Sequence, residues 1–239
     1  MSNIAQLWLV ALFILWAGLL FGGFIFGKEW PDHTRRMPIW TRMASSLTLV
    51  IAAWSAWVFV EGDLKNFALL IAIGMTFGFM GDLFMAGLIP VGDKNQVLGG
   101  ISAFGLGHIA YIGGLLMYAE RIGLTDSSAQ WGAWLFWLLV GGVLWYGVVY
   151  RGREHTVLHL AALPYALLLA STAGFATGLA LQSALFIPLA LGAGLFLISD
   201  LILATQLFNK AYFWLISDVV WLTYGPGQML IVFSIIFLT

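Results

Sequence analysis

The stretch from Ile4 to Phe26 reads IAQLWLVALFILWAGLLFGGFIF and contains no charged residue. A helix needs about 20 consecutive apolar residues to cross the hydrocarbon core of a bilayer, so this stretch is long enough to span it. It is also too long for a signal-peptide core, and the residues before it lack a basic segment and a cleavage site. The stretch therefore predicts a transmembrane helix that the mature protein retains.

Seven more apolar segments of similar length follow, separated by short polar breaks. Of the 239 residues, 62% are hydrophobic and 9% are charged, whereas a soluble domain carries about 25% charged residues. The charged residues are too few to cover a protein surface that faces water. We therefore expect most of the surface to face the lipid bilayer. We predict an all-α, polytopic, multi-pass integral membrane protein with one domain over 1–239, in the inner membrane if the source is bacterial. The eight predicted helices are residues 4–26, 40–60, 66–88, 97–119, 131–150, 156–180, 184–207 and 212–238.

Charge and cysteine content exclude several classes of function. The net charge is −1, so nothing indicates binding to nucleic acid or a polybasic contact with anionic lipid. The absence of cysteine excludes thiolate metal sites, disulfides and cysteine nucleophiles.

The basic residues predict the orientation of the chain. Cytoplasmic loops of membrane proteins collect Lys and Arg. If the loop after the first helix is cytoplasmic, only Lys65 and Arg121 lie outside, and both termini lie on the non-cytoplasmic side. The inner group then comprises Lys28, Arg35, Arg36, Arg42, Lys94, Arg151, Arg153 and Lys210.

Ionisable side chains within the spans are functional candidates, because charge in hydrocarbon costs about 2.5–3.5 kcal/mol per residue on insertion scales. Asp82, Asp200 and Asp218 are each expected about 9 Å inside the cytoplasmic edge, at about 1.5 Å per residue. His159 is expected to be shallower, and His108 to lie near the midplane. The predicted topology thus gathers these residues toward one half of the membrane, which indicates a shared site.

The three carboxyl groups create a charge problem, because no Lys or Arg is expected deep in a span. A buried carboxyl group stays neutral unless a cation accompanies it. One acid could be neutral and donate a proton, a metal could sit among Asp and His, or the ligand could bring a cationic head group. Interhelical hydrogen bonding without any catalytic role is the structural alternative for each acid, and helix-dipole complementation is a further one for Asp218.

Two short patterns lie near these residues. Ser199 precedes Asp200 in a Leu-Ile-Ser-Asp string that recurs at Asp218. A serine nucleophile with His108 is conceivable, although no Gly-x-Ser-x-Gly elbow is present. The second pattern, Tyr224-Gly-Pro-Gly-Gln228, is expected to interrupt the last helix and form a kinked wall of a polar pocket, because proline removes a backbone donor.

The ordered set of motifs resembles the YhhN-like lysoplasmalogenase family of multipass membrane proteins over about residues 40–235. The motifs are Gly81-Asp82, Phe104-Gly-Leu-Gly-His108-Ile-Ala-Tyr111, Tyr165, Phe196-Leu-Ile-Ser-Asp200 and Tyr224-Gly-Pro-Gly-Gln228. The resemblance implies hydrolysis of the vinyl ether bond of lysoplasmalogens to a fatty aldehyde and glycerophosphoethanolamine or glycerophosphocholine. It implies no cofactor, and the partners are then the lysophospholipid substrate and the bilayer.

The residues suit that chemistry, because vinyl ethers hydrolyse through a proton donor and a cationic intermediate. Glycosidases solve a similar problem with two carboxyl groups. We expect Asp82 and Asp200 to form the acid/base pair, without assigning the acid, and His108 to orient or activate water. The expected substrate-binding residues are Tyr111, Tyr165, Tyr224, Gln228, Ser199 and Asp218, the last near the substrate ammonium.

Two other functions fit the same residues. A metal-dependent amide or ester hydrolase would hold zinc with Asp82, His108 and Asp200, although catalytic zinc usually has two or three His ligands. A lipid or small-molecule transporter would also carry broken helices and midplane acids, although no inverted repeat of equal halves is visible.

Overall fold

The computed structural model describes residues 1–151 and 156–239, except for the side chains of residues 93 and 94. Every regular element in this part of the chain is helical, and eight of the helices are long and apolar enough to cross a membrane. The long helices are α1 (Asn3–Phe26), α2 (Ile39–Phe59), α3 (Leu64–Met85), α4 (Asp93–Arg121), α5 (Ser127–Trp145), α6 (Val157–Gln182), α7 (Ile187–Asn209) and α8 (Ile216–Phe237). A π-helix, η1 (Tyr146–Tyr150), continues α5, and a 3-10 turn, η2 (Ala184–Phe186), precedes α7.

The predicted helices are confirmed, and the main differences lie at their ends. Helix α3 stops at Met85, before the predicted residue 88, where Gly87 has a φ of 71°. Helix α8 starts at Ile216 and not at residue 212, because Leu215 is left-handed with a φ of 56°. Hydropathy does not register these backbone conformations, since the flanking residues are as apolar as the helices.

The expected interruption of the last helix is wrong. Helix α8 runs through the Gly-Pro-Gly segment without a break. The two glycines serve close packing instead: a Cβ on Gly225 would lie 2.8 Å from Leu20 of α1, and one on Gly227 would lie 2.9 Å from the carbonyl of Gly192 in α7.

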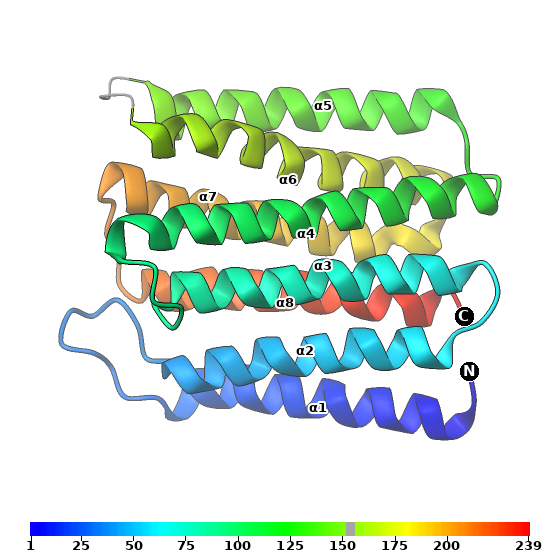
Figure 1. The fold of residues 1–239 in the computed structure, drawn as a ribbon, viewed down its shortest axis with the longest axis horizontal. Helices are drawn as coiled ribbons and strands as arrows, with labels where there is room; N and C mark the ends of the chain where they lie inside the picture. Colours follow the sequence, from blue (N-terminus) through cyan, green and yellow to red (C-terminus); the bar gives the residue numbers. More distant parts are fainter. Residues whose placement is uncertain (152–155) are drawn as a thin grey trace.

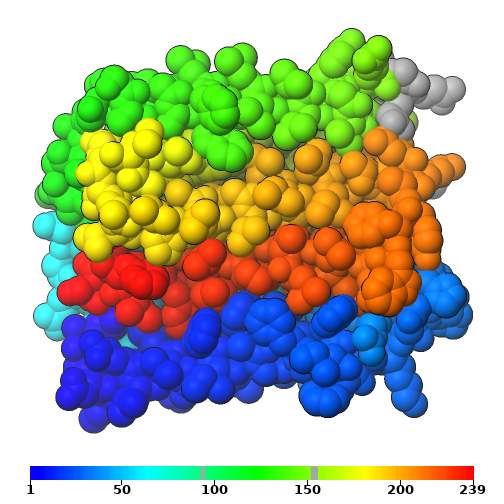
Figure 2. Space-filling view, turned by 180° about the vertical axis from the view of Figure 1, so that it is seen from behind, coloured from blue at the N-terminus to red at the C-terminus, as the bar shows by residue number. Residues whose placement is uncertain are grey.

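The helices alternate in direction, so the two termini lie at the same end of the bundle (Figure 1). Neighbours in sequence pack in pairs, α1 with α2, α3 with α4, α5 with α6, and α7 with α8. Helices α2 and α3 both contact α8. The last helix therefore packs against the N-terminal half of the chain as well as against α7. Seen from behind, α7, α8 and α1 lie side by side across the molecule, with α5 at its edge (Figure 2).

The connections after α1, α3, α5 and α7 share the end of the bundle opposite the termini (Figure 1). This end carries Lys28, Arg35, Arg36, Arg151 and Lys210, while Arg153 lies outside the described residues. The common end agrees with the predicted alternation, and its assignment to the cytoplasm stays a prediction. We call it the loop end.

Small residues on α3 make room for larger side chains of the neighbouring helices. A Cβ on Gly74 would lie 2.2 Å from the ring of Tyr111 in α4, and one on Gly81 would lie 2.7 Å from Phe104 in the same helix. A Cβ on Gly78 would lie 2.8 Å from Nε2 of Gln228 in α8. The three glycines thus allow α4 and α8 to approach α3 closely, as small residues do at membrane helix interfaces.

Replacement of Gly74 by Ala tests this packing. The new methyl group must displace the buried Tyr111 ring, and overpacking of this kind costs about 1–3 kcal/mol. We expect Gly74→Ala to lower the midpoint of thermal unfolding in detergent. The control is Gly18→Ala in α1, where a Cβ would meet no atom within 4 Å and where Ala favours the helix by about 1 kcal/mol. Equal midpoints for the two variants would contradict the packing argument.

The predicted orientation can be tested with single cysteines, because the natural chain has none. Pro31 is exposed in the α1–α2 connection at the loop end, and Glu61 is exposed in the α2–α3 connection at the other end. We expect Glu61→Cys to react with a membrane-impermeant maleimide in intact cells, and Pro31→Cys to react only after permeabilisation. The reverse labelling pattern would overturn the orientation.

Candidate functional site

Asp82 lies in the last turn of α3, buried at 4% exposure. Its Oδ2 accepts a hydrogen bond of 2.5 Å from the Ser46 hydroxyl of α2 and one of 3.1 Å from the Tyr224 hydroxyl of α8. Both donors reach the same oxygen, so Oδ1 has no donor among the described residues. The carboxyl group is therefore held by one oxygen and can present the other to a ligand.

The bonds to Asp82 continue into a longer chain of polar groups. Tyr111 in α4 donates to Oε1 of Gln228 over 2.9 Å, and Nε2 of Gln228 donates to the Tyr224 hydroxyl over 3.3 Å. All of these side chains are buried. The chain fixes their orientation, because a buried polar group without a partner costs free energy.

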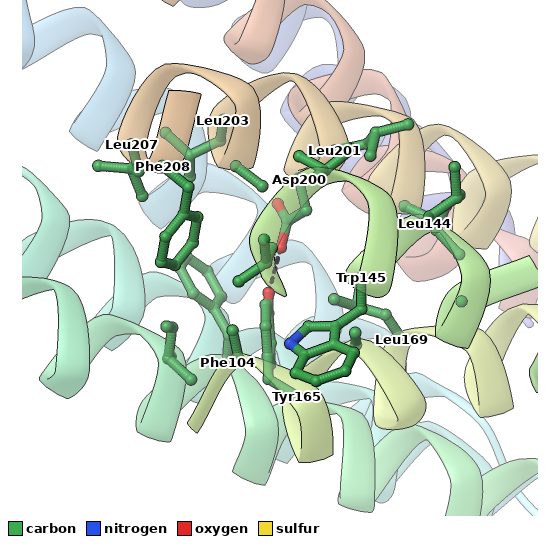
Figure 3. Close-up of a pocket in the computed structure, with 18 of the residues that line it drawn as sticks. Phe104, Leu144, Trp145, Tyr165, Leu169, Asp200, Leu201, Leu203, Leu207 and Phe208 are labelled. Carbon is green, nitrogen blue, oxygen red and sulfur yellow. Dashed lines mark hydrogen bonds between the residues drawn. The ribbon is translucent and has the colours of Figure 1, made fainter. Parts of the chain in front are cut away.

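Asp200 is the second carboxyl group at the site and lies in α7, half-buried. The Tyr165 hydroxyl of α6 donates to its Oδ2. Figure 3 shows the two side chains pointing toward one another, with Phe104 and Trp145 beside them. Among the described residues, one side-chain donor thus holds Asp200, compared with two for Asp82.

An apolar cavity opens on one side of Asp200 (Figure 3). Its walls come from the end of α3, from α4, α6 and α7, and from the junction of α5 with η1, and its volume is about 100 Å³. Apart from Asp200 and Tyr165, the residues of this wall are almost entirely aliphatic or aromatic, including Phe104, Leu144, Trp145, Leu169, Leu201 and Phe208. The cavity suits a hydrocarbon chain.

A polar cavity of about 220 Å³ opens on the other side of Asp200. Asp82 and Tyr224 line it, and so do Arg35 and Arg42 near the loop end. The two cavities have four lining residues in common, Met85, Phe104, Asp200 and Leu203. Asp200 is the ionisable residue among these four, so it marks the junction between an apolar and a polar compartment.

His108 is buried in α4 and lines neither cavity. Its Nδ1 lies 2.9 Å from the Thr172 hydroxyl, which donates to the Leu168 carbonyl. Nε2 of His108 has no hydrogen-bond partner among the described residues. The ring packs against Phe196 at 4.7 Å and Tyr165 at 6.2 Å between centroids.

The serine of the Leu-Ile-Ser-Asp string is part of the polar cavity wall. Ser199 is fully buried and donates to the Val220 carbonyl over 3.1 Å. His108 pairs with Thr172 and not with this hydroxyl, so a Ser–His nucleophile is not assembled. His159 lies at the start of α6, where it forms a capping box with Thr156.

Asp218, the third carboxyl group, is saturated by donors of the protein itself. It accepts from Nη2 of Arg42 at 2.7 Å and from the backbone N–H groups of Arg36 at 2.5 Å and Met37 at 3.2 Å. The expectation that no cation accompanies the spanning acids is therefore wrong for Asp218, because Arg42 is buried in the first turn of α2. These contacts give Asp218 a structural role and leave it no oxygen free for a substrate ammonium.

The α1–α2 connection is hydrogen-bonded at the loop end to the α7–α8 connection and to the first turn of α8. The backbone N–H groups of Leu215 and Ser217 donate to the carbonyls of His33 and Thr34 over 2.9 and 3.0 Å. Trp214 donates to Glu29 over 3.1 Å. The bonds from His33 and Trp214 hold the pKa of Glu29 below its ordinary value. The connection is therefore fixed in place and carries Arg35 to the cavity mouth.

The sequence did not predict four residues of the site. Ser46 and Thr172 are hydroxyl residues within apolar spans, where such residues are common. Arg35 and Arg42 contributed only to the predicted orientation of the chain. A usable signal for α2 was the polar run Thr41-Arg42-Met43-Ala44-Ser45-Ser46, which is unusual for a helix that faces lipid.

The described residues contain no group of three or more His, Asp or Glu side chains that could hold a metal. Asp82, His108 and Asp200 thus do not form the cluster that the zinc alternative requires.

No curated protein and no solved structure matches the chain. The model of one protein family, the YhhN family, matches residues 37–235 and so covers most of the chain, including every residue that lines the two cavities except Arg35. The carboxyl groups, tyrosines and glutamine described above therefore lie within the family's own region, and the chain belongs to the YhhN family, the lysoplasmalogenase family.

Proposed function

We propose that the protein hydrolyses the vinyl ether bond of lysoplasmalogens within the membrane. The observation that carries the proposal is the position of Asp200 at the junction of the apolar and polar cavities. A lysoplasmalogen has its vinyl ether where its hydrocarbon chain meets its glycerophosphate. A substrate with its chain in one cavity and its head group in the other places the scissile bond beside Asp200.

The reaction needs a proton donor on the chain side of the bond and a base on the head-group side. Protonation occurs at the vinyl carbon farther from oxygen, and water attacks the carbon bonded to oxygen. Asp200 borders both cavities, whereas Asp82 borders only the polar one. We therefore assign Asp200 as the general acid and Asp82 as the ionised carboxylate that acts on water.

The proton balance closes over one cycle. Asp200 gives its proton to carbon, and the resulting oxocarbenium ion is stabilised by the Asp82 carboxylate. Water adds to the cation and loses a proton to Asp82, giving a hemiacetal. The hemiacetal hydroxyl then returns a proton to Asp200 while Asp82 protonates the departing glycerol oxygen, so the C–O bond breaks and the aldehyde forms. One water is consumed, and both acids return to their first state.

The neighbouring residues position this pair. Tyr224 and Ser46 hold one oxygen of Asp82, which leaves the other for water. Tyr165 orients Asp200. His108, which borders neither cavity, packs against the Tyr165 ring, so we assign it a positioning role one step away from the chemistry.

Removal of either carboxylic acid tests the assignment. Asp82→Asn and Asp200→Asn keep the side-chain shape but cannot exchange protons. General acid–base groups contribute about 10²–10⁴-fold to rate, so we expect each variant to lose aldehyde release from a lysoplasmalogen by about that factor. The assay is aldehyde formation by purified protein, with the saturated ether analogue as a substrate that yields none.

The matched control is Asp63→Asn at the exposed start of the same helix as Asp82, where the side chain makes no capping bond. It should keep full activity. Near-normal activity in both site variants would refute the acid/base pair. Proton-coupled uptake of lipid by the wild-type protein, with no aldehyde formed, would favour the transporter alternative.

A further inference from the structure

We propose that Arg35 and Arg42 form a phosphate-binding site at the mouth of the polar cavity, which holds the phosphodiester of a lysophospholipid head group. This inference rests on the proposed function and deepens it, because it assigns the group by which the substrate is recognised and placed. The ligand chemistry is an anionic phosphate ester on a single-chain lipid.

Arg42 supplies the first half of the site. Its side chain is 8% exposed and lines the polar cavity. Nη2 is bound to Asp218, but Nε is buried and has no acceptor among the described residues. A buried guanidinium donor without an acceptor is unfavourable, and a phosphate oxygen is the acceptor that arginine binds best. The empty hydrogen-bonding position therefore indicates an anionic ligand.

Arg35 supplies the second half from the α1–α2 connection. It is half-exposed and lines the same cavity. Its guanidinium carbon lies 3.7 Å from the centre of the Trp30 ring, a stacking contact that orders the side chain while leaving its edge for hydrogen bonds. No ion pair within the described residues neutralises it.

The charges of the cavity wall favour an anion close to the arginines. The Asp218 carboxylate balances Arg42, and Arg35 adds a positive charge at the mouth. Asp82 and Asp200, the acids of the wall, lie on α3 and α7 and have tyrosine donors of their own. A phosphodiester between the two guanidinium groups would be paired, while the same group beside the ionised Asp82 carboxylate would be repelled.

The arrangement gives the substrate one direction in the site. The phosphate would lie at the loop end, the glycerol would extend toward Asp82, and the hydrocarbon chain would continue past Asp200 into the apolar cavity. Asp218 acts as a positioning residue here, because it orients Arg42 and holds the segment that follows Arg35.

Binding of an unreactive ligand tests the site without relying on turnover. The probe is the saturated ether analogue of lysoplasmenylethanolamine, titrated into purified protein in detergent, with tryptophan fluorescence as the signal, since Trp221 lies in the cavity wall. Because charge-assisted bonds to phosphate are strong, we expect Arg35→Gln to raise the Kd by about tenfold or more.

The chain offers a matched control in Arg36, the next residue. Its guanidinium lies over Phe24 and reaches the Ile25 carbonyl, outside the cavity wall. Arg36→Gln removes the same charge from the same connection and should leave the Kd within about twofold, which is well under the tenfold that 1.4 kcal/mol represents. Equal weakening by the two variants would reduce the effect to general electrostatics and overturn the site.

A second pair of probes separates phosphate recognition from lipid binding. The 1-alkyl glycerol without phosphate should bind wild type and Arg35→Gln equally, because it has nothing for the guanidinium to hold. Weaker binding of this neutral lipid by Arg35→Gln would also overturn the site. Glycerophosphoethanolamine should compete with the ether analogue, whereas competition by inorganic phosphate at equal strength would assign the site to free phosphate and overturn the head-group assignment.

Arg42 requires a paired variant, because removal of Arg42 alone leaves Asp218 buried and uncompensated. Arg42→Gln combined with Asp218→Asn removes both charges together. We expect the purified double variant to lose affinity for the phosphate-bearing analogue and to keep affinity for the alkyl glycerol. If the double variant does not fold, Arg42→Lys, which keeps the charge but lacks Nε, should show the same selective loss, and unchanged affinity in the variant that folds would overturn the role of Arg42.

These outcomes separate the site from the reaction. Selective weakening by Arg35→Gln in a protein that forms no aldehyde would retain the phosphate site and remove the proposed hydrolysis. Aldehyde formation with equal Kd values for wild type and Arg35→Gln would retain the hydrolysis and remove the phosphate site.

Discussion

The structure depends on one constraint: a carboxyl group inside a lipid-surrounded bundle must find hydrogen-bond donors on other helices. Asp82 takes its donors from α2 and α8, Asp200 from α6, and Asp218 from α2 and the segment before it. Asp82 and Asp218 thereby connect helices that are distant in the sequence, and Asp200 connects the consecutive helices α6 and α7. The polar groups that could do chemistry are also the groups that fix how α2, α3, α6, α7 and α8 meet.

The three aspartates differ in how many hydrogen-bond donors their carboxyl groups have. Asp218 has three donors, one of them a guanidinium, and lies outside both cavity walls. Asp82 and Asp200 are bound on one oxygen each and border space that a ligand can enter. A carboxyl group that has a hydrogen-bond donor on only one oxygen and borders a cavity is a candidate catalytic acid, whereas one with donors on both oxygens is structural. Residue type and depth in the membrane alone do not make this distinction.

The sequence predicted the helices well, because a run of about 20 apolar residues has few alternatives in a membrane protein. The approach of Asp82 and Asp200 to one cavity also followed from topology, since the alternation of helices brings the ends of α3 and α7 to one side. The predicted equal depths in the membrane stay a prediction, and the structure gives the positions of the acids along their helices. Asp82 and Asp218 lie in terminal turns, whereas Asp200 lies farther along its helix from the loop end.

Pairing between side chains could not be predicted in the same way. The Arg42–Asp218 ion pair joins residues 176 positions apart, and the partner of His108 is a threonine 64 positions away. Such pairs depend on helix rotation and on which residues are small enough to let neighbours approach. Gly74, Gly78 and Gly81 provide the space that Tyr111, Gln228 and Phe104, respectively, occupy. The sequence shows that a glycine is present in an apolar span, but it does not show which side chain of a neighbouring helix packs against it.

The meeting of two unlike cavities at Asp200 has a consequence for what happens after the bond breaks. In the proposed reaction the aldehyde is oil-soluble and the glycerophosphate is water-soluble, and each is formed in the compartment that matches its own solubility. The fragments would therefore depart in opposite directions, one sideways into lipid and the other toward the aqueous face. Such separation would make the cleavage hard to reverse and would clear the chamber without a moving gate.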